Sequence, residues 1–305
     1  MPFKRELQTM KSSLNRRIDL DFVGLGNAGI GYGGHLHAWS FRDIDGEEWF
    51  SEFRETSLDA IGTRFLPIYR MADGEYRFLM GRKFNSARRP LIREIAAIAA
   101  ERLRIKNPDK WKTSWGEEYS PEMTRGLRAE LIDSIRYISR YGYLACYVND
   151  NGLNAFTEYN QALESYFEAQ DITFGSENYV PFHFAPSLFI ASGWRAFIER
   201  RSILIVTGII PEKEKRIRAT LEAMGAARVQ FLPISLSASM TDRIDLSSNI
   251  EHVDVCLVAA GIGSANILRQ LAPLQTLSVD IGGLMNCLVD PNIRQHGGVI
   301  GLPQF

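Results

Sequence analysis

Cysteine is scarce: the 305-residue chain has three, Cys146, Cys256 and Cys287, which lie far apart. An odd number of widely spaced thiols shows no metal-site spacing and favours reduced thiols over a disulfide framework. No uninterrupted apolar run reaches the roughly 20 residues that a membrane-spanning helix requires. The basic stretch 1–17 also lacks the apolar core of a signal peptide. These absences predict a cytoplasmic protein without a transmembrane segment.

An excess of either charge is missing as well, since the formal net charge is -1. No overall basic field would draw the protein to nucleic acid, so no nucleic-acid partner is expected. The chain contains no Gly-x-Ser-x-Gly elbow and no Cys/His pairing that would indicate a covalent nucleophile. Hydrophobic residues are well represented at 45%, which predicts a folded globular chain with a sizeable core.

The last hundred residues alternate between apolar, β-branched runs and amphipathic helical stretches. The runs predict buried strands, and the stretches between them predict helices that end at glycine or proline. Strands are expected at 202–208, 229–234, 253–260 and 275–281, with helices from about 212 to 224 and from Ser264 onward. This alternation predicts an α/β fold, with a mostly parallel sheet and helices on its faces.

The middle of the chain is helical and then aromatic. Apolar residues at helical spacing predict one helix that starts near Ser86 and another from about 122 to 140. The stretch 141–194 is rich in aromatic residues and loop signals. Aromatic rings either form a stacking platform for a sugar or simply fill a core; they include Tyr159, Tyr166, Phe167, Phe174, Tyr179, Phe182, Phe184 and Trp194.

The most informative segment runs from Ile68 to Tyr76 and is expected to be a short strand that ends in Asp73-Gly74-Glu75. Two carboxylates two residues apart on extended chain point to the same side, and the glycine leaves room for a ligand. Arg70 precedes them, and its guanidinium suits a phosphate. The segment therefore predicts a seat for Mg²⁺ or Mn²⁺ against a diphosphate. The alternative is an ordinary turn with two solvated charges.

A glycine cluster near the start also has a formal match. Gly24, Gly26 and Gly29 fit G-x-G-x-x-G after a strand expected over 18–23. A dinucleotide site requires a helix at the third glycine. Here more glycines follow, and each costs about 1 kcal/mol in a helix interior. A glycine loop that covers the active site is therefore favoured over a dinucleotide site.

A second glycine turn, Gly261-Ile262-Gly263-Ser264, follows a buried strand and opens a helix. Ser264 is expected to cap that helix, whose free N–H groups would bind phosphate. The alternative is a tight turn without a ligand. Gly208 and Asp280 end two other strands and are expected at the same edge of the sheet, where Asp280 would bind ribose or sugar hydroxyls.

Two residues in the aromatic stretch are candidates for a general base. His183 and Glu177 both lie in a segment rich in loop signals. Either side chain can accept a proton from an acceptor hydroxyl. The alternative for a single histidine is a structural role in the core.

Arg70-x-x-Asp73-Gly74-Glu75 resembles the R-x-G-D-G-E signature of the GT-D type glycosyltransferases. The later succession of strand, glycine turn, helix and closing strand, which ends in aspartate-isoleucine-glycine, is similar as well. The resemblance covers roughly 61–291. It divides the chain into an N-terminal extension, 1–60, and a catalytic domain, 61–305.

The sequence departs from the family's pattern at two positions. Ala72 stands where the family usually has glycine, and Gly283 follows 280–282 where the family commonly has histidine. The role of that histidine therefore has no counterpart at position 283.

The resemblance implies a Rossmann-like domain that transfers a sugar from a nucleotide-diphosphate donor, typically a UDP-sugar, to a saccharide-bearing acceptor. Asp73 and Glu75 would hold Mn²⁺ or Mg²⁺ and the diphosphate, with Arg70 beside them; Glu75 is the alternative base if Asp73 alone binds the metal. The family does not fix the oligomeric state, and a homo-oligomer is compatible with it. Two other functions stay open: an NAD(P)-dependent oxidoreductase that uses the N-terminal glycines, and a non-catalytic nucleotide- or partner-binding domain.

Overall fold

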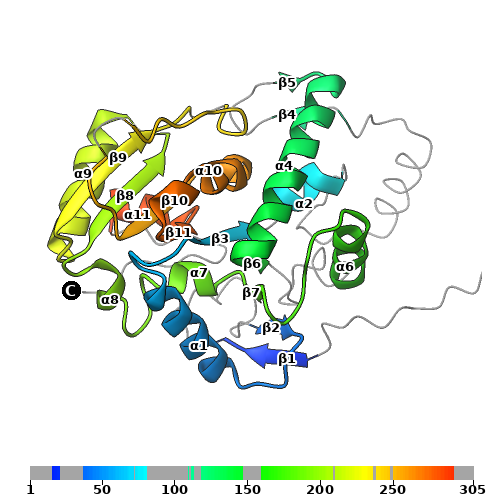
Figure 1. Ribbon diagram of the computed structural model, residues 1–305, viewed down its shortest axis with the longest axis horizontal. Helices are drawn as coiled ribbons and strands as arrows, with labels where there is room; N and C mark the ends of the chain where they lie inside the picture. Colours follow the sequence, from blue (N-terminus) through cyan, green and yellow to red (C-terminus); the bar gives the residue numbers. More distant parts are fainter. Residues whose placement is uncertain are drawn as a thin grey trace, which may run out of the picture.

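A computed structural model of the protein (Figure 1) describes residues 16–20, 37–71, 73–80, 109, 111–112, 118–146, 159–208, 210–235, 238–247 and 250–291. Its centre is a seven-stranded sheet whose neighbouring strands are all parallel. In chain order these strands are β3 (Leu66–Met71), β6 (Tyr143–Cys146), β7 (Tyr179–Pro181), β8 (Ser202–Thr207), β9 (Arg228–Pro233), β10 (Val255–Ala259) and β11 (Leu277–Asp280). Across the sheet the order is β7-β6-β3-β11-β10-β8-β9. The predicted α/β class is confirmed.

The central strands are buried on both faces, which explains their continuous apolar runs. Every residue of β3, β8 and β11 is buried. A strand covered by helices on both sides has no solvent face, so its sequence does not alternate. The four strands expected in the last hundred residues are thereby confirmed, with ends shifted by at most two residues.

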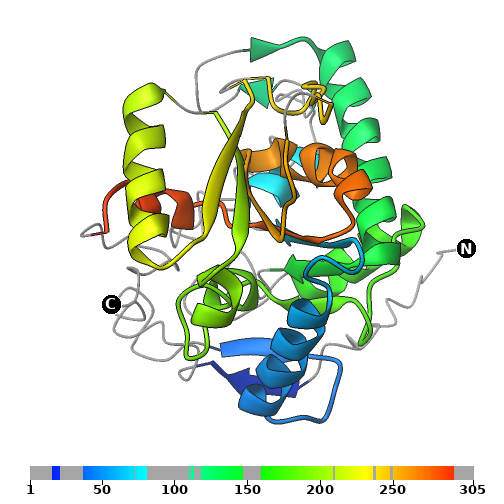
Figure 2. The same cartoon turned by 60° about the vertical axis from the view of Figure 1, so that its left-hand side comes forward.

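The helices follow from the strand order by the rule that parallel crossovers are right-handed. The steps from β3 to β6 and from β10 to β11 run in one direction along the sheet, whereas the step from β8 to β9 runs in the other. Accordingly α4 (Pro121–Tyr141) packs against α10 (Ser264–Gln270), and α9 (Pro211–Ala223) packs against α11 (Leu284–Val289). Figure 2 shows α4 and α9 on opposite sides of the molecule.

The longest helix, α4, begins and ends where its sequence dictates. The Ser120 side chain accepts a hydrogen bond from the Met123 N–H, and proline occupies the first turn. The buried stripe comprises Leu127, Leu131, Ile135 and Ile138. After the helix, Gly142 passes so close to Pro67 that a Cβ there would lie 2.7 Å from the proline Cδ. The predicted helix over 122–140 is confirmed.

The N-terminal part adds a separate two-stranded ribbon. β1 (Arg16–Asp19) pairs antiparallel with β2 (His37–Ser40), and α1 (Gly46–Asp59) follows. Gly24, Gly26 and Gly29 lie outside the described residues, but the strand before them belongs to this ribbon and not to the parallel sheet. A dinucleotide fingerprint requires that the strand before the glycines belong to the parallel sheet. The strand before Gly24 does not meet this requirement, which argues against the oxidoreductase alternative. The boundary at residue 60 stays a prediction.

The aromatic stretch contains more regular structure than expected. Besides β6 and β7 it forms α6 (Tyr159–Ala169), α7 (Phe184–Ser187) and α8 (Arg195–Ile198). Buried aromatics of this stretch pack against α1, with Phe184 edge-on to both Trp49 and Phe50. For Phe167, Tyr179, Phe184 and Trp194, all buried, the core alternative is confirmed.

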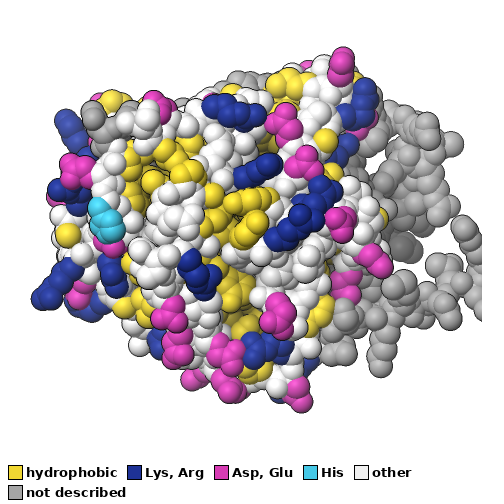
Figure 3. All heavy atoms as spheres, in the orientation of Figure 1, with side chains coloured by type: hydrophobic (Ala, Val, Ile, Leu, Met, Phe, Trp, Pro, Cys, Tyr) yellow, Lys and Arg dark blue, Asp and Glu magenta, His cyan; other side chains and the backbone are white. Residues whose placement is uncertain are grey.

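The remaining elements are short. They are α2 (Asp73–Met80), β4 (Trp111–Lys112), β5 (Glu118–Tyr119), and the 3₁₀ turns η3 (Gly261–Gly263) and η4 (Ala272–Leu274). The helix expected from Ser86 lies outside the described residues. Within the ranges that are described, no helix has the length and apolar character needed to cross a bilayer. Figure 3 shows acidic and basic side chains interspersed on one face of the molecule.

Candidate functional site

The candidate site lies at the carboxyl ends of β3 and β11. On one side of β3 the neighbours are β6 and β7, which come next in the sheet; on the other side are β11 and the strands of the C-terminal half. The register pairs Ile68 with Val279, so Arg70 and Asp280 end adjacent strands. In open parallel sheets, ligands bind at the carboxyl ends of the strands.

Asp73 does not lie on extended chain, because α2 begins at this residue directly after β3. Side chains two positions apart on a helix do not face each other. The expectation that Asp73 and Glu75 point to the same side of an extended chain is therefore wrong. The Asp73 side chain lies outside what the structure describes. Glu75 is half-buried, and its charge acts on both Arg70 and Tyr69.

Arg70 is the most informative side chain of the site. It is 8% exposed, and its Nε and Nη1 atoms are buried without a hydrogen-bond partner among the described residues. Burial lowers the pKa of Arg70, while the charges of Asp280 and Glu75 raise it. A guanidinium stays charged in a protein. Two buried donor groups on a fixed cation are suited to an anionic ligand.

Asp280 is 4% exposed at the end of β11. Burial raises its pKa to about 6; the positive charge of Arg70 opposes that rise, as do hydrogen bonds from the backbone N–H groups of Gly282 and Arg70 and from the Ser264 hydroxyl. The Gly282 N–H donates to its Oδ1 atom over 3.1 Å. Asp280 thus connects the ends of β3 and β11 with the start of α10, which places it in the site that the sequence predicted for it.

Asp280→Asn should stabilise the protein at pH 7.5 and change little at pH 4. The folded-state pKa of about 6 lies above the ordinary aspartate pKa of 3.8, so ionised Asp280 destabilises the fold, and this cost appears as pH rises through about 4 to 6. We expect a gain of about 1–3 kcal/mol at pH 7.5, measured by urea unfolding. Asp59→Asn, at an exposed position, is the control. Equal effects of Asp280→Asn at both pH values would contradict this assignment.

The glycine turn after β10 is built differently from the expected helix cap. The Ser264 hydroxyl accepts a hydrogen bond from the Ala260 N–H over 3.2 Å and bonds to Asp280, and α10 has no side-chain cap. At Gly263 a Cβ would lie 2.6 Å from the Ser239 carbonyl carbon. The missing side chain therefore makes room for Ser239, and the expected role of Gly263 and Ser264 in phosphate binding stays a prediction.

Two other predicted positions keep their place at this edge. Gly261 has a φ of +55° and no atom within 4 Å of an added Cβ, so the turn is open there. Gly208 follows β8, next to Thr207, whose hydroxyl donates to the Ala259 carbonyl over 2.8 Å. Gly74 lies in α2 with open space around it. Their roles in donor binding stay predictions.

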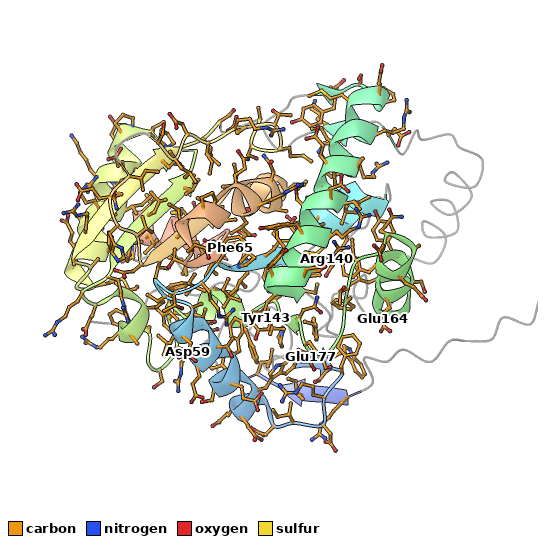
Figure 4. All side chains as sticks on the ribbon, in the orientation of Figure 1. Asp59, Phe65, Arg140, Tyr143, Glu164 and Glu177 are labelled. Atoms are coloured by element: carbon orange, nitrogen blue, oxygen red, sulfur yellow. The ribbon has the colours of Figure 1, made fainter. Side chains whose placement is uncertain are left out.

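Glu177 lies at the opposite edge of the sheet. It precedes β7, and parallel strands share one direction, so it belongs to the amino ends of the strands. Its charge acts on Tyr143, the first residue of β6, and Figure 4 shows both on the α1 side of the molecule. Glu177 is therefore placed wrongly for the role of base at a site built around Arg70.

His183 lies near Arg70 but is buried. Burial, together with the positive charge of Arg70, lowers the pKa of His183 to about 3. At neutral pH the imidazole is uncharged and a weak base. The core alternative for His183 fits these properties better than a role in proton transfer.

The carboxylates of the site fit a divalent ion only if substrate phosphates and water complete its coordination shell. Among the residues described, no three His, Cys, Asp or Glu side chains form a metal-binding group. Mg²⁺ commonly takes one or two carboxylates and completes its shell with substrate phosphates and water. Glu75 meets that requirement beside Arg70, and Asp73 precedes it by two residues on the same helix.

Sequence reasoning did not place Phe182 and Gly282 next to Arg70. The Phe182 ring lies 4.4 Å from the Arg70 guanidinium carbon. At Gly282, a Cβ would lie 3.0 Å from that same carbon and closer still to Nη2. A usable signal existed, because Phe182 follows a strand and Gly282 follows Asp280, but the three-residue strand β7 was not predicted.

Comparison with known proteins gives one weak likeness of fold. No family model matches the chain, and no curated protein matches it. The chain is similar to a solved structure described as "The highly conserved domain of unknown function 1792 has a distinct glycosyltransferase fold". The likeness covers 76% of this chain and 81% of that one, with 14% identity and a TM-score of 0.39. At that level it supports no assignment of activity.

Proposed function

We propose that the protein is a metal-dependent glycosyltransferase, one that moves a sugar from a nucleotide-diphosphate donor, a UDP-sugar in the first instance, to a glycan, glycolipid or glycoprotein acceptor. Polysaccharide biosynthesis is a process that uses such a reaction. The observation that carries the proposal is the buried Arg70 guanidinium, with two donor atoms unpartnered among the described residues, near the carboxyl end of a strand of the parallel sheet.

The chemistry of the leaving group explains why this site suits the reaction. When the bond from the sugar to the diphosphate breaks, negative charge develops on a phosphate oxygen. Fixed hydrogen-bond donors at that position stabilise the transition state because they need no reorganisation. The Nε and Nη1 atoms of Arg70 are held at the end of β3 for such a contact.

Asp73 and Glu75 are the proposed ligands of Mn²⁺ or Mg²⁺. Such an ion, when bound, supplies a Lewis acid that neutralises the developing charge. What supports this choice is that both residues lie in the first turn of α2, which follows the strand that carries Arg70. Asp280 would accept hydrogen bonds from ribose or sugar hydroxyls.

The acceptor hydroxyl requires a base, and the described residues leave one of the three candidates in place. Glu177 lies at the other edge of the sheet, and His183 is a weak base. Glu75 is half-buried beside Arg70 and takes this role if Asp73 alone binds the metal.

Calorimetry with UDP tests the proposal directly. We expect wild-type protein to bind UDP more tightly with Mn²⁺ than without. Asp73→Asn or Glu75→Gln should weaken the Mn²⁺-dependent UDP affinity by at least about tenfold, because even the loss of a group that only contacts a metal ligand costs about that much. Glu177→Gln is the matched control, because it removes a carboxylate at the opposite edge and should leave binding unchanged.

Two outcomes would reject the proposal. If UDP does not bind with or without Mn²⁺, the donor site is not a diphosphate site for uridine nucleotides. If UDP binds but no UDP-sugar is hydrolysed or transferred, the protein is a nucleotide-binding domain without transferase activity.

A further inference from the structure

The guanidinium of Arg70 lies in a slot formed by an aromatic ring and a glycine backbone, those of Phe182 and Gly282. The Phe182 ring centroid lies 4.4 Å from the guanidinium carbon, within the range of a cation–π contact. The backbone of Gly282 also approaches so closely that any Cβ there would collide with the guanidinium. These two contacts restrain Arg70.

The backbone fixes the position of the ring. Phe182 directly follows β7, and its N–H donates to the Cys146 carbonyl over 3.0 Å, which extends the pairing of β7 with β6. The His183 ring meets it nearly edge-on, with centroids 5.4 Å apart. Phe182 itself is half-buried, whereas Arg70 is 8% exposed.

The slot has an electrostatic consequence. Asp280 and Glu75 both attract Arg70, and an unrestrained guanidinium would turn to pair with a neighbouring carboxylate in bidentate fashion. Instead, Nε and Nη1 have no hydrogen-bond partner among the described residues. The arrangement leaves two donors unused in spite of nearby acceptors.

We infer that Phe182 is a positioning residue that holds Arg70 so that its Nε and Nη1 donors are available to a phosphate or diphosphate group of a ligand. The identity of that anion rests on the proposed function; the restraint on Arg70 does not. Phe182 acts through Arg70 and needs no contact of its own with the ligand.

The test compares Phe182→Leu, which keeps an apolar side chain but removes the π face, with Phe182→Tyr, which keeps both. Inorganic pyrophosphate is the probe, and its affinity is measured by calorimetry. Cation–π contacts of about 0.5–2 kcal/mol correspond to roughly twofold to thirtyfold in affinity. We expect Phe182→Leu to bind pyrophosphate about tenfold more weakly, and Phe182→Tyr to stay within about twofold of wild type.

A second readout requires no ligand. The Nε–H resonance of Arg70, identified by its loss in Arg70→Lys, should be moved upfield by the ring in wild type and in Phe182→Tyr, and should lose that shift in Phe182→Leu. A resonance unchanged in Phe182→Leu, or equal affinities in all three proteins, would overturn the inference. If wild type shows the ring shift but does not bind pyrophosphate, the diphosphate site of the proposed function fails, while the restraint on Arg70 stands.

Discussion

Arg70→Lys should weaken UDP binding by about 100-fold, the largest effect expected from a single conservative change in this protein. Lysine keeps the positive charge but loses the planar set of donors that contacts two phosphate oxygens at once. Hydrogen bonds to charged groups contribute about 1.5–3 kcal/mol each, so the loss of one or two accounts for that factor. The shorter reach of an ammonium also leaves the space between Phe182 and Gly282 partly empty.

The measurement is the dissociation constant of UDP in the presence of Mn²⁺. Arg136→Lys is the matched control: the Arg136 guanidinium donates to the Gln170 carbonyl over 2.7 and 3.2 Å, and it lies near the end of α4, at the amino edge of the sheet. Wild-type affinity in Arg70→Lys would mean that the buried guanidinium serves the fold and not a ligand.

The sheet was predictable from the sequence because strands buried on both faces have continuous apolar sequences. β8 and β10 are continuous apolar runs of the kind that only a covered strand requires, and helix-forming stretches separate them. β6 and β7 were missed for a physical reason. They have four and three residues, too few for periodicity, and their neighbours are aromatic side chains that pack in strands, helices and loops alike.

The candidate site was predictable in part. Asp280 was expected at the carboxyl edge of the sheet, and strand register places it beside the end of β3, which carries Arg70. The sequence could not show that Gly263 accommodates Ser239, because that contact joins positions 24 residues apart through a loop without a repeating pattern. Nor could it show that His183 is buried beside a cation, since burial of a single side chain depends on the whole tertiary structure.

Gly282→Ala should both destabilise the protein and abolish UDP binding. Gly282 has a φ of +42°, a conformation that costs an L-residue roughly 1–2 kcal/mol. An added methyl would also collide with the Arg70 guanidinium, and overpacking of this kind costs about 1–3 kcal/mol more. We expect the free energy of unfolding, measured with urea, to fall by about 2–5 kcal/mol, and Arg70 to be displaced from its slot.

Gly62→Ala separates the two causes. Gly62 has a φ of +65°, but an added Cβ would meet only the Asp254 carboxylate oxygen at an ordinary 4.0 Å, and it lies before β3 at the amino edge. This control should show the backbone cost alone and bind UDP normally. In an Arg70→Ala background, Gly282→Ala should cost no more than Gly62→Ala, because the guanidinium that the methyl would strike is gone. An undiminished cost in that background would show that the glycine is required by the backbone turn after β11, and that its closeness to Arg70 is incidental.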